Sequence, residues 1–125
     1  MKTVNTDKAP AAIGPYSQAI ISGGFVFTSG QIPVDPATGV IAGETIVEQA
    51  KQVMANLQVV LAAAGTTPER TVKTTCFLAD MADFAAFNEI YAQTFTSKPA
   101  RSCVAVRTLP KGVLCEVEVI AEVEY

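Results

Sequence analysis

A helical repeat in the middle of the chain constrains the fold more than any other feature of the sequence. Apolar residues recur there at the 3.6-residue spacing of an amphipathic helix, at Ile46, Ala50, Val53, Met54, Leu57, Val60, Leu61 and Ala64. Gly65 and then Pro68 follow as stop signals. The spacing therefore predicts one long helix that starts near Glu44 and packs its apolar face against another layer.

Runs typical of β-strands flank this helix on both sides. The expected strands are residues 19–21, 25–28, 71–79, 102–106 and 113–124. Ser22-Gly23-Gly24 joins the first two as a hairpin, and the Pro- and Gly-containing residues 31–43 are expected to form a loop. In the third strand we expect Val72, Cys76 and Leu78 on one side and Phe77 on the other.

A second helix is predicted before Pro99, with Asp80 as its N-cap. Its apolar stripe consists of Phe84, Phe87, Tyr91 and Phe95. The element order is then ββαβαββ, which predicts an α/β (α+β) fold in which two helices cover one face of a sheet. A chain of 125 residues predicts a single domain, residues 1–125.

The last strand has one apolar face and a second face that is partly apolar. Val113, Cys115, Val117, Val119, Ala121 and Val123 share the first face, and Leu114, Glu116, Glu118, Ile120 and Glu122 share the second. A face that mixes aliphatic residues with carboxylates is neither plain core nor plain surface. Half of the chain is hydrophobic and only 17% is charged, so contact between copies of the chain, or a site wall, would suit this face.

Charge and composition exclude several kinds of partner. The net charge of −3, with no basic run, argues against a nucleic-acid partner. No apolar run approaches the length of a membrane span, and the first eight residues lack the apolar region of a signal peptide. Cys76, Cys103 and Cys115 are odd in number and form no C-x-x-C motif, which favours reduced thiols and a cytoplasmic location.

The chain contains no histidine, which narrows its chemistry. No histidine-based triad or histidine-ligated metal site can be built, and no metal-binding spacing or nucleotide-binding glycine motif is present. We therefore expect no metal and no cofactor. Acid–base chemistry would fall to carboxylates, tyrosine, cysteine or ordered water.

Two charged residues are the main candidates for the chemistry. Arg101 lies between a rigid Pro99 and a β-like run, which suits a clamp for a small carboxylate, although a structural ion pair is the commoner role of an arginine. Glu116 stands on the last strand and is the candidate general base; a solvated carboxylate is the alternative. Glu118 faces the same way and competes for the role.

Five further residues are candidates for the wall of a binding site, each with a plain structural alternative. Tyr16 follows a Gly-Pro pair and suits an aromatic wall, or simple packing. Ser29 and Gly30 end a strand, where a bare glycine lets a backbone N–H approach an anion, or merely forms a turn. Asn88 is a polar residue in an apolar helix or a surface residue, and Cys103 is more often a small buried residue than a nucleophile.

Several segments form a recognisable series along the chain: residues 12–19, 28–33, 72–78, 83–84 with Asn88 and Tyr91, 99–104, and 109–112 followed by 116–118. Taken in order, they resemble the RidA family of reactive intermediate deaminases, formerly called YjgF. Each segment alone is a weak signal, but together they span nearly the whole chain. Residues 96–98 are shorter than the matching segment of many members, which would alter the cleft rim and the substrate size preference.

The resemblance implies a chorismate-mutase-like fold, a homotrimer with its sheets around the threefold axis, and active sites between subunits. It implies hydrolysis of 2-imino acids, or their enamine tautomers, to 2-keto acids and ammonium. Pyridoxal-phosphate enzymes release these reactive imines, and the activity is that of a 2-iminobutanoate/2-iminopropanoate deaminase. The clamp arginine of the family corresponds to Arg101 and its water-holding glutamate to Glu116, while the pocket-lining positions correspond to Tyr16, Ser29, Gly30, Asn88 and Cys103.

Two other classes of function compete with this hypothesis. A non-catalytic trimer that binds small carboxylates, or acts as a chaperone-like regulator, would need Arg101 but has no use for Glu116. Some relatives have been described as ribonucleases or translation inhibitors, and the acidic balance of this chain disfavours that function.

Overall fold

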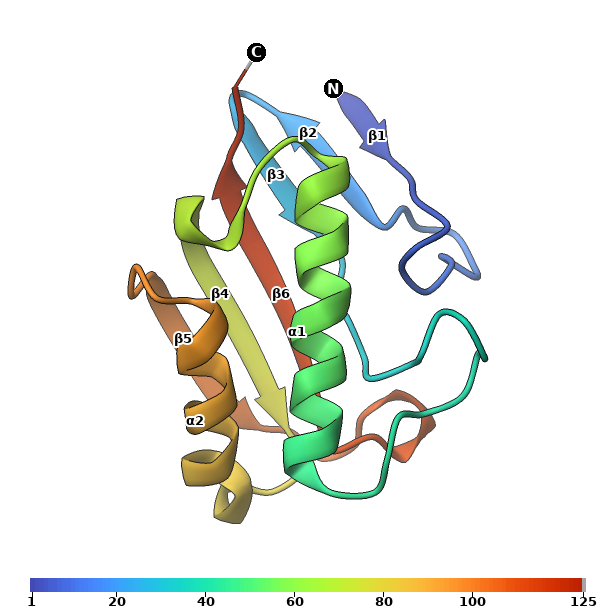
Figure 1. Ribbon diagram of the computed structural model, residues 1–125, viewed down its shortest axis with the longest axis vertical. Helices are drawn as coiled ribbons and strands as arrows, with labels where there is room; N and C mark the ends of the chain where they lie inside the picture. The colour runs from blue at the N-terminus through green and yellow to red at the C-terminus, as the bar shows by residue number, and fades with distance from the viewer. Residues whose placement is uncertain (125) are drawn as a thin grey trace.

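The predicted central helix, α1 (Ile46–Ala63), lies across one face of a six-stranded sheet in the computed structural model, which describes residues 1–124 (Figure 1). It begins at Ile46 rather than near Glu44 because Thr45 forms a capping box with Glu48. The Thr45 hydroxyl accepts a hydrogen bond from the Glu48 N–H, and the Glu48 carboxylate accepts one from the Thr45 N–H. At the other end Gly65 adopts a left-handed backbone with φ 82°, as a stop signal requires.

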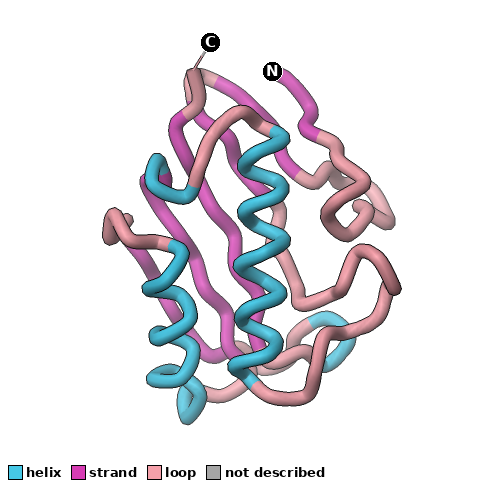
Figure 2. The backbone as a smooth tube through the Cα atoms, in the orientation of Figure 1, coloured by secondary structure: helices cyan, strands magenta, loops and turns pink. Residues whose placement is uncertain are grey.

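The sheet has the strand order β1-β2-β3-β6-β4-β5. Its strands are β1 (Lys2–Val4), β2 (Ala19–Ser22), β3 (Phe25–Thr28), β4 (Thr71–Leu78), β5 (Ala100–Ala105) and β6 (Cys115–Glu122). All neighbours pair antiparallel except β4 and β5, which run parallel. The predicted α+β class, with both helices on one sheet face, is confirmed (Figures 1 and 2). The three-residue β1 at the sheet edge was not predicted, because so short a strand shows no alternation.

The second helix, α2 (Phe84–Thr94), starts later than the predicted N-cap suggested. Asp80 does cap, but the element it caps is a 3₁₀ turn, Met81–Asp83, through a 2.8 Å hydrogen bond from the Ala82 N–H to its carboxylate. Further 3₁₀ turns lie at Pro68–Arg70 and Pro110–Gly112. The predicted aromatic stripe holds α2 to the sheet, since the rings of Phe87, Tyr91 and Phe95 are buried and contact one another in sequence.

One side-chain assignment in β4 was wrong. Cys76 and Leu78 are buried as predicted, but Val72 is 42% exposed, and Thr71 is buried instead. The pairing of β4 with β6 shifts register between Thr71 and Lys73, which is a β-bulge. The extra residue reverses the alternation at that end of the strand, so a strict period of two misplaces Val72.

Strand β6 occupies the middle of the sheet and confirms the predicted alternation. Cys115, Val117, Val119 and Ala121 are buried on its helix-covered side, and Val113 and Val123, just beyond the ends of the strand, are buried as well. On the other side Leu114, Glu116 and Ile120 are only partly buried, and Phe27 of β3 and Val104 of β5 are 42% and 46% exposed. No second layer within residues 1–124 covers this open face.

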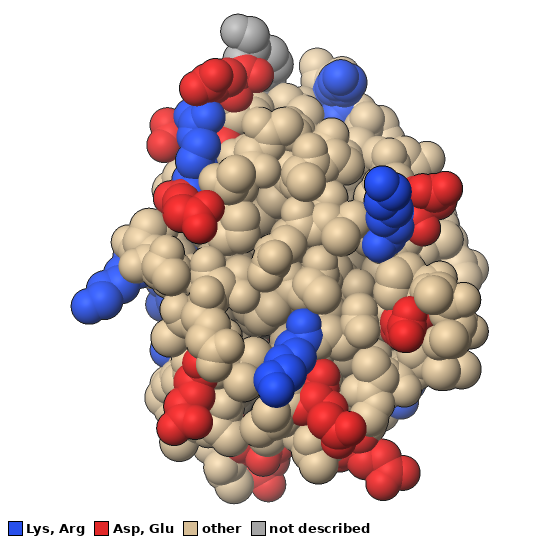
Figure 3. Space-filling view, viewed as in Figure 1, with Lys and Arg blue, Asp and Glu red and all other residues tan. Residues whose placement is uncertain are grey.

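The molecular surface carries charges of both signs. On the helix-covered face, Lys and Arg side chains are interspersed with Asp and Glu, and no basic patch forms (Figure 3). No helix within the described residues has the length and apolar character needed to cross a membrane.

Buried amide side chains hold the long loops against the helix and the sheet. They belong to Gln18, Gln49 and Asn56. The Asn56 amide donates hydrogen bonds of 3.1 and 3.0 Å to the carbonyl oxygens of Ile32 and Val34, which fixes the loop over residues 31–43 to α1. Such loops have few apolar contacts of their own, so these bonds position the segment that the sequence predicted to be irregular.

Replacement of Asn56 by leucine tests this role. Asn56→Leu keeps the volume but leaves two carbonyl oxygens without their donor, so we expect unfolding free energy to fall by about 1–3 kcal/mol. Urea unfolding followed by circular dichroism measures the change. Gln58→Leu, at an exposed position of the same helix, is the control and is expected to change stability by less than about 0.5 kcal/mol. Equal losses in the two variants would contradict the assignment.

Candidate functional site

Arg101 is held on the edge strand β5 by contacts that leave its charge unbalanced. Its Nη1 donates a 2.8 Å hydrogen bond to Oδ1 of Asn88 on α2. The guanidinium carbon lies 4.7 Å from the ring centroid of Tyr91 and 5.4 Å from that of Phe84. No carboxylate within residues 1–124 pairs with Arg101, so the structural ion pair considered above is not formed. Most of the five guanidinium donors remain available to a ligand.

A cavity of about 300 Å³ opens beside Arg101. Its lining residues are Asn88, Tyr91, Ala92, Phe95, Lys98, Pro99 and Arg101. The sequence pattern assigned Phe84 and Tyr91 to the core alone and missed their place beneath the guanidinium. The signal was their spacing, because Phe84, Asn88 and Tyr91 lie at i, i+4 and i+7, on one side of a helix.

Cys103 lies on the same side of β5 as Arg101 and is directly opposite Cys76 of β4. Burial raises the pKa of the Cys103 thiol, an effect that the nearby Arg101 only partly offsets. Burial likewise raises the pKa of Cys76, to about 12. Both thiols are therefore protonated at neutral pH, which argues against Cys103 as a nucleophile. Cys103 is not among the residues that line the cavity beside Arg101.

Glu116 lies on the open face of β6, half-buried and without a hydrogen bond or ion pair within the described chain. Burial raises the pKa of this carboxyl above its usual value, and the neighbouring Glu118 raises it further. Glu118 itself is exposed. Gly30 makes room for Glu116, because a Cβ at position 30 would stand 2.8 Å from the Glu116 carboxyl carbon. Any larger residue at position 30 would push the carboxylate out of its place.

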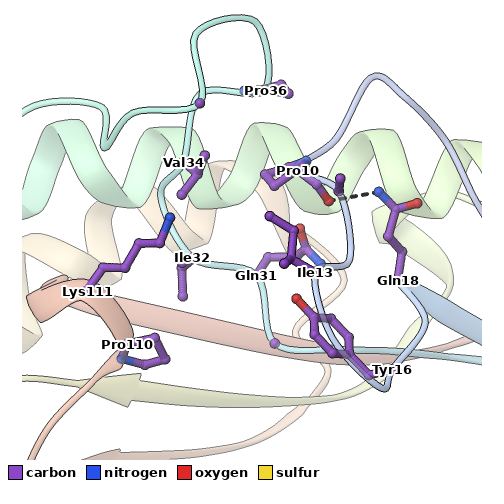
Figure 4. A pocket seen from close by; sticks show the side chains of 13 residues that line it. Pro10, Ile13, Tyr16, Gln18, Gln31, Ile32, Val34, Pro36, Pro110 and Lys111 are labelled. Carbon is purple, nitrogen blue, oxygen red and sulfur yellow. Dashed lines mark hydrogen bonds between the residues drawn. The ribbon is translucent and has the colours of Figure 1, made fainter.

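Ser29 and Tyr16 are positioned together. The Ser29 hydroxyl donates a 2.5 Å hydrogen bond to the carbonyl oxygen of Ser17, and the Ser29 N–H donates a 2.9 Å bond to that of Gln18. These bonds fix the loop that carries Tyr16, whose side chain is 54% exposed. Tyr16 and Gly30 both line a second cavity of about 660 Å³, shown in Figure 4.

The candidate residues form two groups on opposite faces of the sheet. Arg101 of β5 pairs with Thr74 of β4, and Thr74 pairs with Val119 of β6. Thr74 and Val119 are both buried on the face that the helices cover. Glu116 pairs with Phe77, which lies three residues after Thr74 on β4 and therefore points to the other face of the sheet. Because laterally paired residues point to the same face, Arg101 and Glu116 point to opposite faces. One chain thus groups Arg101 with Asn88 and Cys103, and Glu116 with Gly30, Ser29 and Tyr16.

The described residues contain no cluster of three or more Cys, Asp and Glu side chains that could hold a metal ion. We call the group around Arg101 the Arg101 half-site and the group around Glu116 the Glu116 half-site. The guanidinium and the Asn88 amide of the first can bind a carboxylate, and the carboxylate of the second can accept a proton.

Comparison with known proteins agrees with the fold and with the arrangement of the segments. The profile of a family described as Endoribonuclease L-PSP matches residues 6–123. A RutC family protein of Synechocystis is 56% identical over 124 residues, covering 97% of this chain and 95% of its own. The 2-iminobutanoate/2-iminopropanoate deaminase of Salmonella typhimurium is 50% identical over 124 residues, covering 96% of each chain.

Solved structures give the same result. Escherichia coli TdcF with bound serine superposes with a TM-score of 0.94 at 44% identity, covering 99% of this chain and all of the other. The YjgF gene product of the same organism gives 0.93 at 45% identity, covering 98% of both chains. The chain therefore belongs to the RidA (YjgF) family, as the resemblance of its segments indicated.

The raised pKa of Glu116 has a consequence for stability. The folded state binds the Glu116 proton more tightly than the unfolded state, so the ionised carboxylate lowers stability above the folded pKa, and this loss vanishes as pH falls below the unfolded value. We expect Glu116→Gln to unfold at a higher urea concentration than the wild type at pH 7. The difference should shrink toward pH 4. A gain that does not change with pH would contradict the cause assigned here.

Proposed function

We propose that the protein hydrolyses 2-imino acids, including their enamine tautomers, to 2-keto acids and ammonium, as a 2-iminobutanoate/2-iminopropanoate deaminase does. The observation that carries the proposal is the guanidinium of Arg101, held by one amide and two rings and paired with no carboxylate within residues 1–124. The name of the Salmonella relative, at 50% identity, supports the same reaction.

Arg101 binds the substrate carboxylate in this proposal. The planar guanidinium can donate two parallel hydrogen bonds to a carboxylate, and its remaining bond to Asn88 fixes the plane in which it does so. The aromatic surfaces of Phe84 and Tyr91 support the cation without neutralising it. A 2-imino acid then has its electrophilic C2 next to the clamp, at a fixed distance from the carboxylate.

Glu116 supplies the general base. The substrate reacts as its protonated iminium, C=NH₂⁺. The Glu116 carboxylate accepts a proton from a water molecule while the water oxygen bonds to C2, and the C=N electron pair moves to nitrogen. The protonated Glu116 returns that proton to the nitrogen of the resulting carbinolamine. The C–N bond then breaks, the hydroxyl loses its proton to the leaving ammonia, and the products are a 2-keto acid and ammonium. A raised carboxyl pKa favours this exchange, because a base works best when its pKa approaches the working pH.

The two half-sites must come from different copies of the chain if Arg101 and Glu116 act on one substrate. We propose that they meet between the subunits of a homotrimer. The open sheet face supplies a contact surface, since it exposes Phe27 and Val104 beside the half-buried Ile120. The whole chain, residues 1–125, would act as one domain in each subunit. Its three unpaired cysteines suit the cytoplasm.

The family description Endoribonuclease L-PSP names a different reaction. The interspersed charges of the helix-covered face and the net charge of −3 give little attraction for phosphates, so we do not propose it here. A trimer that binds carboxylates without turnover remains the second candidate. The unpaired Glu116 separates the two, because only the hydrolase requires it.

Replacement of Arg101 tests the clamp. With iminobutanoate generated in situ from threonine by a dehydratase, Arg101→Ala should lower kcat/KM by roughly 30- to several thousand-fold, since the substrate carboxylate loses its charged partner. Arg101→Lys should also be poor, because an ammonium cannot replace the planar fork. Keto-acid appearance measures the rate, and circular dichroism checks the fold. Near-full activity of Arg101→Lys would exclude bidentate binding.

Replacement of Glu116 tests the base. Glu116→Gln is nearly isosteric and should lower turnover by roughly 10²–10⁴-fold while affinity for a 2-keto acid stays within a few-fold. Glu118→Gln, two residues along the same face, is the matched control and should matter much less. Wild-type turnover in Glu116→Gln would refute the assignment. A larger loss in Glu118→Gln would move the water to that carboxylate.

A further inference from the structure

A larger cavity continues from the Glu116 half-site, and the proposed reaction leaves it unexplained. The cavity, about 660 Å³, is named here the Tyr16–Lys111 pocket after the residues near its two ends (Figure 4). It shares Gly30 with the Glu116 half-site, because Gly30 lines the pocket and also lies against the Glu116 carboxylate. Gly30 therefore places the pocket next to the Glu116 carboxylate. The one- or two-carbon side chain of 2-iminopropanoate or 2-iminobutanoate would fill only a small part of that volume.

Gln31 gives the pocket an amide that bonds to no other group of the described chain. The residue is only 5% exposed and lines the pocket. Its backbone N–H and carbonyl pair with Val117, but its side-chain amide makes no hydrogen bond within the described chain. The amides of Gln18, Gln49 and Asn56 are all bonded, so Gln31 differs from the other buried amides of the fold. Among the described residues, Thr71 Oγ1 is the side-chain polar atom that is both fully buried and without a partner, so the Gln31 amide is accessible from the pocket and can donate to a ligand there.

Lys111 gives the pocket a cation. It lies between Pro110 and Gly112 with a left-handed backbone, φ 58°, which only a few per cent of residues other than glycine adopt. No carboxylate within residues 1–124 pairs with it. Figure 4 shows its side chain extending along the pocket wall beside Ile32 and toward Val34. The charge is thus available to an anion inside the pocket.

The remaining walls are apolar. They are formed by Pro10, Ile13, Ile32, Val34, Pro36 and Pro110. A ligand that suits this lining has an aliphatic stem for these walls and an oxygen acceptor for the Gln31 amide and the Lys111 ammonium, which both line the pocket. A purely aliphatic side chain would offer neither donor a partner, and a purely polar one would lose the apolar contacts.

We infer that the Tyr16–Lys111 pocket binds the side chain of a dicarboxylic 2-imino acid, with its second carboxylate between Gln31 and Lys111. The inference rests on the proposed function and names a substrate class for it. Arg101 of one copy holds the carboxylate next to the imine, and Gln31 and Lys111 of the copy that supplies Glu116 hold the distant one. The reaction is the hydrolysis written above, and the second carboxylate takes no part in it.

Three 2-imino acids test the inference when each is generated in situ from its amino acid by a flavin oxidase that accepts it. They derive from alanine, norvaline and glutamate, so the last two have side chains of similar length and differ in the terminal carboxylate. Hydrolysis is followed as protection from semicarbazone formation by semicarbazide. Lys111→Gln should lower kcat/KM for 2-iminoglutarate by roughly five- to tenfold and leave 2-iminopropanoate within about twofold, because one charge-assisted hydrogen bond is lost. Gln31→Leu should show the same selectivity.

Lys51→Gln, at an exposed position of α1, makes the same change in net charge and should leave all three substrates unchanged. The inference is overturned if the wild type hydrolyses 2-iminopropanoate but Lys111→Gln affects all three substrates equally or none of them. If the wild type does not hydrolyse 2-iminopropanoate, the proposed function fails. Calorimetric measurement of 2-keto acid binding then tests the pocket assignment separately. Tighter wild-type binding of 2-oxoglutarate than of 2-oxopentanoate, with the preference lost in Lys111→Gln, would support the pocket assignment. Equal affinities would overturn it.

Discussion

The alternation of side chains along β6 is the constraint on which the rest of the structure depends. The strand lies between β3 and β4, so one of its faces must complete the core under α1 while the other has no cover within the chain. A shift of one residue would bury Glu116 and expose Val117, which the hydrophobic effect forbids. The packing of the core therefore fixes the face on which the carboxylate stands. It also separates that carboxylate from Arg101, whose register position belongs to the helix-covered face.

Both charged groups of the proposed site are kept available at some cost to the fold. Arg101 rests on an amide and two aromatic rings, which position a cation without neutralising it. Glu116 is half-buried beside a bare glycine, and burial together with the neighbouring Glu118 raises the pKa of its carboxyl. Folded proteins usually pair such groups, and unpaired ones concentrate at functional sites. The Gln31 amide is likewise left without a partner in the described chain, and it faces the Tyr16–Lys111 pocket.

Local periodicity accounts for the parts of the fold that the sequence predicted. The stripe of α1, the glycine hairpin and the alternation of β6 each depend on residues that are neighbours in the chain. The bulge that exposes Val72 and the short strand β1 depend on pairing with distant strands, which a local pattern does not contain. The same limit applies to the site. Arg101 and Glu116 were candidates by residue type, but the rings beneath Arg101 and the opposite facing of the two residues follow from strand register.

The central claim is that Arg101 and Glu116 act on one substrate from two copies of the chain. It is tested most directly by mixing two inactive variants, Arg101→Ala and Glu116→Gln, in equal amounts, unfolding them together and refolding them. In random trimers, a site that takes Arg101 from one subunit and Glu116 from its neighbour is intact in about one case in four, so about a quarter of the wild-type hydrolysis should return. Each variant refolded alone should stay inactive. A mixture no more active than the separate variants would show that the two residues do not meet across a subunit interface.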